Sequence, residues 1–153
     1  MRKIFLLFLI LVFVNSCGYT SLYKNNNTKE IKFNIQVVET AGNSDINNYI
    51  ISYLNRYIEP GSDEKITIKL DTDFIKTGIS NNAKGETTAY SLIVKAIFET
   101  NIKNQNKKIV LKEKIKINKF NDTFEQKNYE EKIKKNISNT IVDKFINRIS
   151  ILR

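Results

Sequence analysis

Apolar and polar residues alternate along most of this chain, and the period of the pattern changes from one segment to the next. Between residues 31 and 39 every second residue is apolar, which predicts a strand with one buried face. From Ile46 to Ile58 the apolar residues recur at steps of three and four, which predicts a helix. Asn43 or Ser44 can cap its start, and Glu59-Pro60-Gly61 ends it.

Three further segments show the two-residue period of strands. Residues 66–74 predict a second strand, and the Asn, Ser, Ala and Gly residues from Gly78 to Gly85 predict a hairpin loop. Residues 86–102 predict a third strand, and residues 107–120 predict a fourth strand after a turn at residues 104–106.

The last segment, from about Phe124 to Ser150, carries apolar residues at four-residue steps and predicts a long helix. The resulting order is strand, helix, strand, strand, strand, helix. This order predicts an α+β fold, a two-layer sandwich in which a four-stranded, mainly antiparallel sheet carries both helices on one face. The other sheet face includes Ile93 and Ile97 among charged residues, so a partner could cover it, although scattered surface apolar residues are also normal.

The start of the chain has a different pattern. Two cations, Arg2 and Lys3, precede eleven apolar residues, a run too short to span a bilayer but typical of a signal peptide. The run ends in Val14-Asn15-Ser16-Cys17, which fits the bacterial lipobox. We therefore predict a lipoprotein signal peptide at residues 1–16, a tether with a lipidated Cys17 at residues 17–30, and a single domain at residues 31–153. The alternative is an ordinary signal peptide with a coincidental cysteine.

Composition argues against several classes of function. The chain contains no His, and Cys17 is its single cysteine, so the commonest acid–base group and the usual thiol chemistry are missing. Asp71 and Asp73 share one face of a predicted strand, but solvated surface explains them better than catalysis. We expect no enzyme and no cofactor other than the covalent lipid, and an exported protein without a nucleic-acid motif argues against a nucleic-acid partner.

The formal net charge is +9, which suggests anionic partners such as phosphorylated glycolipid or membrane headgroups. The same lysine excess is also what an AT-rich genome produces by codon bias. The densest cluster lies in residues 103–119, where seven lysines accompany one glutamate. A solvated edge strand protected from aggregation by lysines is the alternative explanation of this cluster.

The motif Cys17-Gly18-Tyr19-x-x-Leu22-Tyr23, together with this order of elements in about 150 residues, resembles the LptE-type lipoproteins of lipopolysaccharide assembly, especially their alphaproteobacterial members. The resemblance implies a sandwich of a small sheet and two helices, anchored in the outer membrane and facing the periplasm. It also implies a role as plug and assembly partner of the large β-barrel LptD, which delivers lipopolysaccharide to the cell surface. The family motif names no catalytic residue.

Two sets of candidate contact residues follow. The lysines of the predicted fourth strand are candidates for lipopolysaccharide phosphates: Lys107, Lys108, Lys112, Lys114 and Lys116. Candidates for partner contact lie in the tether, the predicted hairpin loop and the second sheet face: Tyr19, Leu22, Tyr23, Gly78, Asn81, Asn82, Ile93 and Ile97. A generic envelope lipoprotein that scaffolds another outer-membrane complex is the alternative function, and a carrier of an apolar ligand is a further one.

Overall fold

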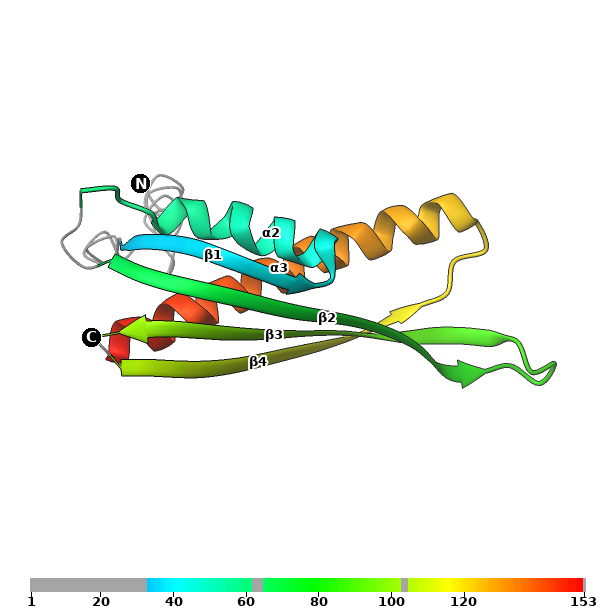
Figure 1. The fold of residues 1–153 in the computed structure, drawn as a ribbon. Helices are drawn as coiled ribbons and strands as arrows, with labels where there is room; N and C mark the ends of the chain where they lie inside the picture. Colours follow the sequence, from blue (N-terminus) through cyan, green and yellow to red (C-terminus); the bar gives the residue numbers. More distant parts are fainter. Residues whose placement is uncertain (1–32, 62–64, 103–104, 153) are drawn as a thin grey trace, which may run out of the picture.

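The computed structural model describes residues 33–61, 65–102 and 105–152. Its elements follow the predicted order: β1 (Asn34–Gly42), α2 (Ser44–Leu54), a short 3-10 helix η2 (Asn55–Tyr57), β2 (Lys65–Asn81), β3 (Thr87–Ile102), β4 (Gln105–Asn118) and α3 (Thr123–Leu152). The strands form one sheet in the order β1-β2-β3-β4. Both helices lie on the same face of this sheet, so the predicted two-layer α+β fold is confirmed (Figure 1).

The sheet is antiparallel except at one edge. β2 pairs with β3 and β3 with β4 in antiparallel register, whereas β1 runs parallel to β2. A parallel neighbour requires a crossover connection, and α2 with η2 supplies it. β1 accompanies only the first half of β2, up to Thr72, so β2 and β3 extend beyond it as a long hairpin (Figure 1).

Both helices begin at a side-chain cap. Asn43 Oδ1 accepts a hydrogen bond from the backbone N of Ile46 at 3.1 Å at the start of α2. At the start of α3, Asp122 Oδ1 accepts from the backbone N atoms of Phe124 at 2.7 Å and Glu125 at 2.8 Å. These caps satisfy backbone donors that have no partner within the helix.

The core lies between the sheet and the two helices. Phe98 of β3 and Phe145 of α3 are fully buried and stack with ring centroids 4.1 Å apart. Two polar contacts hold α3 beside the first helical segment: the hydroxyl of Tyr57 in η2 donates to Asp143 Oδ1 at 2.8 Å, and Tyr49 of α2 contacts Glu131. These contacts hold α3 against β3, α2 and η2.

Several element boundaries differ from those predicted. β1 continues to Gly42, three residues beyond the predicted strand of residues 31–39, because a bulge at Val38 shifts the alternation by one residue. The α-helix of α2 ends at Leu54, four residues earlier than predicted, and Ile58 instead bridges to Phe33.

The predicted hairpin loop from Gly78 to Gly85 is also wrong in its extent. β2 continues to Asn81, and Gly78 and Asn81 pair with Tyr90 and Thr87 of β3. The loop therefore contains only residues 82–86, and two of the residues predicted at the tip belong to the strand.

Candidate functional site

The sheet face opposite the helices carries several of the predicted contact residues. On this face the register of the strands aligns side chains into rows that run across the sheet. One row is purely charged: Glu39, Lys69, Glu99 and Lys108. Lys69 Nζ lies 2.8 Å from Glu39 Oε2, and Lys108 Nζ lies 3.1 Å from Glu99 Oε1. We call this row the charged ladder.

The ladder shifts two pKa values in opposite directions. The hydrogen bond from Lys69, and then its charge, lowers the pKa of the Glu39 carboxyl. The hydrogen bond to Glu39, and then its charge, raises the pKa of Lys69. Both groups are exposed, so this pair orders the surface and adds little to stability.

Apolar side chains alternate with the charged rows. Ile97 lies between Asp71 of β2 and Val110 of β4, and Ile93 lies between Ile75 and Lys114. The register places Ile93 and Ile97 on the open face, as the sequence predicted, and both side chains are half-buried. The open sheet face is thus amphipathic, with apolar positions enclosed by charges.

The five lysines predicted to contact lipopolysaccharide do not form one cluster in the structure. Lys112, Lys114 and Lys116 follow one another on the open face of β4, and we call them the lysine edge. Within the described residues none of these three forms an ion pair, and Lys112 lies opposite Lys95. Lys108 is neutralised by Glu99.

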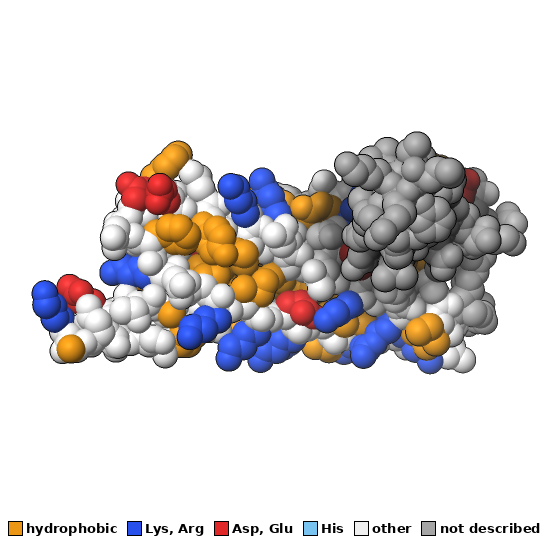
Figure 2. Space-filling model, turned by 180° about the vertical axis from the view of Figure 1, so that it is seen from behind, with side chains coloured by type: hydrophobic (Ala, Val, Ile, Leu, Met, Phe, Trp, Pro, Cys, Tyr) orange, Lys and Arg blue, Asp and Glu red, His pale blue; other side chains and the backbone are white. Residues whose placement is uncertain are grey.

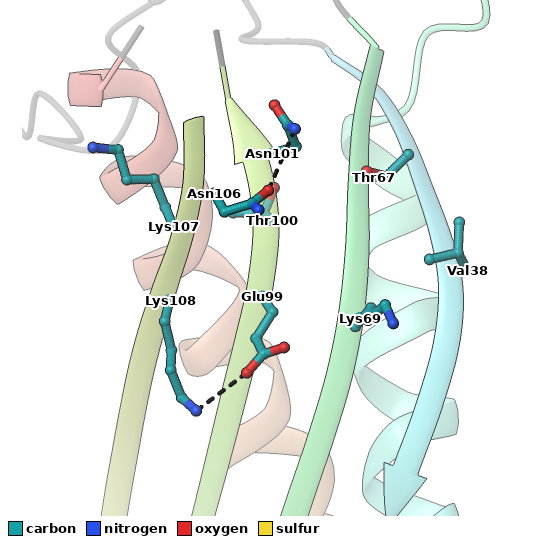
Figure 3. A pocket seen from close by; sticks show the side chains of 9 residues that line it. All are labelled: Val38, Thr67, Lys69, Glu99, Thr100, Asn101, Asn106, Lys107 and Lys108. Carbon is teal, nitrogen blue, oxygen red and sulfur yellow. Dashed lines mark hydrogen bonds and ion pairs between the residues drawn. The ribbon is translucent and has the colours of Figure 1, made fainter. Parts of the chain in front are cut away.

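Lys107 lies apart from the other lysines of β4. It has the strand parity of Ile109, which is buried towards the helices, and its side chain points away from Lys108 towards the last turns of α3 (Figure 3). The parity was visible in the sequence, because Lys107 is an even number of residues from the apolar positions of the strand.

A shallow hollow of about 530 Å³ lies at the end of the open face where β1 and β2 begin (Figure 3). Lys69, Glu99 and Lys108 of the ladder line it, together with Val38 and Thr67. A second hollow of about 250 Å³ continues it and shares those three ladder residues. Because the ladder charges are already paired, this surface suits a polar contact better than capture of one strongly charged group.

The hairpin tip is a tightly hydrogen-bonded turn. Asn82 Oδ1 accepts from the backbone N atoms of Lys84 at 2.9 Å and Glu86 at 3.0 Å, and Asn82 Nδ2 donates to Glu86 Oε2 at 2.8 Å. Gly85 supplies the left-handed conformation, with φ of 80°. Asn82 therefore shapes the tip through its own side chain.

Sequence reasoning missed an aromatic group next to the start of α3. Phe120 and Tyr129 contact each other with ring centroids 5.1 Å apart, and Phe124 is 70% exposed. Tyr129 belongs to the apolar pattern of the helix, with Ile133 four residues later, yet it is 37% exposed. Apolar side chains gather on this side of the molecule, above a row of Lys and Arg side chains at its lower edge (Figure 2).

The predicted residues of the tether, Cys17, Tyr19, Leu22 and Tyr23, lie outside the described residues. Neither helix of residues 33–61, 65–102 and 105–152 combines the length and apolarity needed to cross a bilayer. In the same ranges no three His, Cys, Asp or Glu side chains converge where a metal ion could bind.

The structure thus defines a class: a two-layer α+β domain with one helix-covered sheet face and one open, amphipathic face. No protein-family model matches the chain, and no curated protein matches it by sequence. Solved structures share the fold. Rare lipoprotein B from Shewanella oneidensis is similar with a TM-score of 0.57 and 9% identity, over 76% of this chain and 98% of that one.

A second similar structure is an uncharacterized lipoprotein B from Nitrosomonas europaea. Its TM-score is 0.52 at 9% identity, and the similarity covers 79% of this chain and 88% of that one. At such low identity the comparison shows a common fold, and almost the whole length of both solved domains is included.

Proposed function

We propose that this protein is an envelope lipoprotein of the LptE type. It is lipidated on Cys17, anchored in the outer membrane and facing the periplasm, and it plugs and helps to assemble an LptD-type β-barrel that delivers lipopolysaccharide. The observation that carries this proposal is the fold. The two-layer arrangement that the Cys17-Gly18-Tyr19 motif implied is present, and two bacterial proteins named as lipoproteins share it.

The surface of the domain supports a role in partner contact. A plug inside a polar barrel needs a rigid body with mixed polar contacts over a wide area. The charged ladder and the ordered hairpin tip supply such contacts at two separate places. The stacked Phe98 and Phe145 fill the space between sheet and α3, which disfavours a carrier with an apolar cavity.

The lysine edge is the proposed contact for lipopolysaccharide phosphates. Lys112 and Lys114 have no described carboxylate as partner, so their charge is available to an anion. Lysines attract phosphate as point charges, and this attraction weakens as salt rises. Lys107 and Lys108 contribute less, because one points elsewhere and the other is paired.

The test of the main proposal is an affinity purification of the tagged, detergent-extracted lipoprotein from its own cells. Recovery of an LptD-type barrel in near-equal amount supports the proposal. If the lipidated, folded protein brings down a different outer-membrane complex, the alternative of a general envelope scaffold replaces it. A Cys17→Ala variant is the matched control for the anchor, and we expect it to lose the outer-membrane location.

The lipid contact needs its own test with charge-matched variants. Lys112→Gln with Lys114→Gln removes two charges from the lysine edge, and Lys127→Gln with Lys132→Gln removes two from exposed positions of α3. We expect the first pair to weaken binding of purified lipopolysaccharide several-fold at low salt and the second to have little effect. Equal effects of both pairs would show that net charge alone is responsible.

A further inference from the structure

One end of the domain contains both ends of the described chain and two exposed aliphatic side chains. The register places Asn34 beside Lys65, and Ile102 beside Gln105, at this end of the sheet. The last turn of α3 lies at the same end (Figure 1). Its final residues, Ile151 and Leu152, are 84% and 41% exposed, whereas Ile149 just before them is buried.

The nearby charges are mainly positive among the described residues. Lys65 begins β2, Arg148 lies one helical turn before Ile151, and Lys107 points towards the last turns of α3 (Figure 3). Glu59, whose backbone N donates to the carbonyl oxygen of Phe33 at 2.8 Å, is an acidic residue of the same end. Lysine and arginine can lay their methylene stems along an apolar surface while their charges stay in water, as side chains at a bilayer surface do.

The position of the predicted lipid anchor indicates what this end of the domain contacts. Fifteen residues, 18–32, separate Cys17 from Phe33. Sixteen Cα–Cα steps reach at most about 55 Å when fully extended, so lipid on Cys17 would keep this end near the bilayer. A short tether can raise the effective concentration of a linked site to roughly millimolar, which favours even a weak contact of two side chains.

We propose that this end of the domain docks on the phospholipid surface, with Ile151 and Leu152 inserted among the headgroups and Lys65, Lys107 and Arg148 around them. The inference rests on the lipidation of Cys17, which is part of the proposed function. It assigns Lys107 a role separate from the lysine edge. The hairpin tip and the first turn of α3 lie at the opposite end of the domain (Figure 1).

Electrostatic attraction to anionic lipids does not explain this contact alone, because the sequence between Gly61 and Lys65 adds the anionic residues Asp63 and Glu64. The apolar side chains make the stronger prediction: contact should persist on zwitterionic vesicles and at high salt. The chain contains no tryptophan, so one introduced tryptophan reports its surroundings without background.

The experiment compares two single-tryptophan variants, Ile151→Trp and Phe124→Trp, in the full lipidated protein. Both replace exposed apolar residues, at opposite ends of the domain. Each is incorporated into phosphatidylethanolamine–phosphatidylglycerol vesicles that contain brominated lipids, which quench tryptophan on contact. We expect several-fold quenching and a blue shift for the first variant, and neither for the second.

The outcomes separate this proposal from the one on which it rests. Mass spectrometry and vesicle flotation first establish whether Cys17 carries lipid. With the lipid present, equal weak quenching of both variants overturns the docking contact but leaves the anchor intact. An unmodified Cys17 overturns the anchor and the docking together. Adding Leu152→Lys to Ile151→Trp should reduce the quenching, and unchanged quenching would show that the introduced tryptophan creates the contact by itself.

Discussion

Gly42 is expected to be the most sensitive glycine of the described chain, and Gly85 provides a matched comparison. Both have left-handed backbones, with φ of 83° and 80°. At Gly85 a Cβ atom would meet nothing within 4 Å, whereas at Gly42 it would overlap the carbonyl oxygen of Thr72 and lie 2.9 Å from Asp71 Oδ1. Replacing each with alanine therefore imposes the same backbone strain but a clash at Gly42 alone.

The two magnitudes can be separated. The strain of a left-handed alanine costs about 1–2 kcal/mol at either position. At Gly42 the clash must also displace the junction of β1 and α2. That junction contains the hydrogen bond from Asn43 N to Thr72 O at 2.9 Å and the bond from Thr72 Oγ1 to Asn43 O at 3.1 Å. Each lost bond costs about 1 kcal/mol, so we expect Gly42→Ala to cost at least about 3 kcal/mol.

Urea unfolding measures the difference directly. With a slope of about 1.5 kcal/mol per molar urea, Gly42→Ala should lower the unfolding midpoint by roughly 2 M or more, and Gly85→Ala by roughly 0.7–1.3 M. A third variant, Gly85→Asn, should lose less than Gly85→Ala, because asparagine tolerates this conformation better. Equal losses for the two alanine variants would refute the reasoning, since they would mean that the junction relaxes around the added carbon.

Three other predictions follow from buried or hydrogen-bonded side chains. Phe145→Ala removes a fully buried ring stacked on Phe98 and should cost about 3–5 kcal/mol in urea unfolding; a loss below about 1 kcal/mol would contradict the packing. Burial, and then the hydrogen bond to Asp143, raise the pKa of Tyr57 above its ordinary 10.0. The neutral phenol therefore stabilises the folded state at pH values below 10. This stabilisation is lost as the pH rises through the raised pKa. Tyr57→Phe should flatten this alkaline decline in the unfolding free energy, and an unchanged decline would assign it to another group. Asn82→Ala should speed amide exchange within the hairpin tip while lowering global stability by about 1 kcal/mol or less; unchanged exchange would show that the backbone alone holds the turn.

The fold was predictable because each element has a long, regular apolar pattern. Strand ends were less predictable, since they depend on partners that the pattern does not reveal. The run from Gly78 to Asn81 has the composition of a loop, yet pairing with β3 keeps it in the strand, and Thr87 packs close to Gly78. Tertiary pairing there outweighs local preference.

Two features of the contact surface differ in how far the sequence reveals them. The separation of Lys107 from the lysine edge follows from strand parity, so it could have been predicted from residues 107–117 alone. The charged ladder could not, because it joins side chains of four strands and depends on their register. The bulge at Val38 shifts that register, which brings Glu39 rather than Val38 opposite Lys69.

The register also determines where charge is available on the open face. Towards β1 the cation Lys69 lies between Glu39 and Glu99, so positive charge there is compensated within the ladder. Towards β4 no described carboxylate lies opposite the lysine edge, because Lys112 is opposite Lys95, Lys114 opposite Ile93 and Lys116 opposite Ser91. An anion approaching this face should therefore be drawn to the β4 side. An acidic protein segment would meet the same preference, so salt dependence alone cannot distinguish a lipid phosphate from a carboxylate, whereas competition between purified lipopolysaccharide and an acidic peptide can.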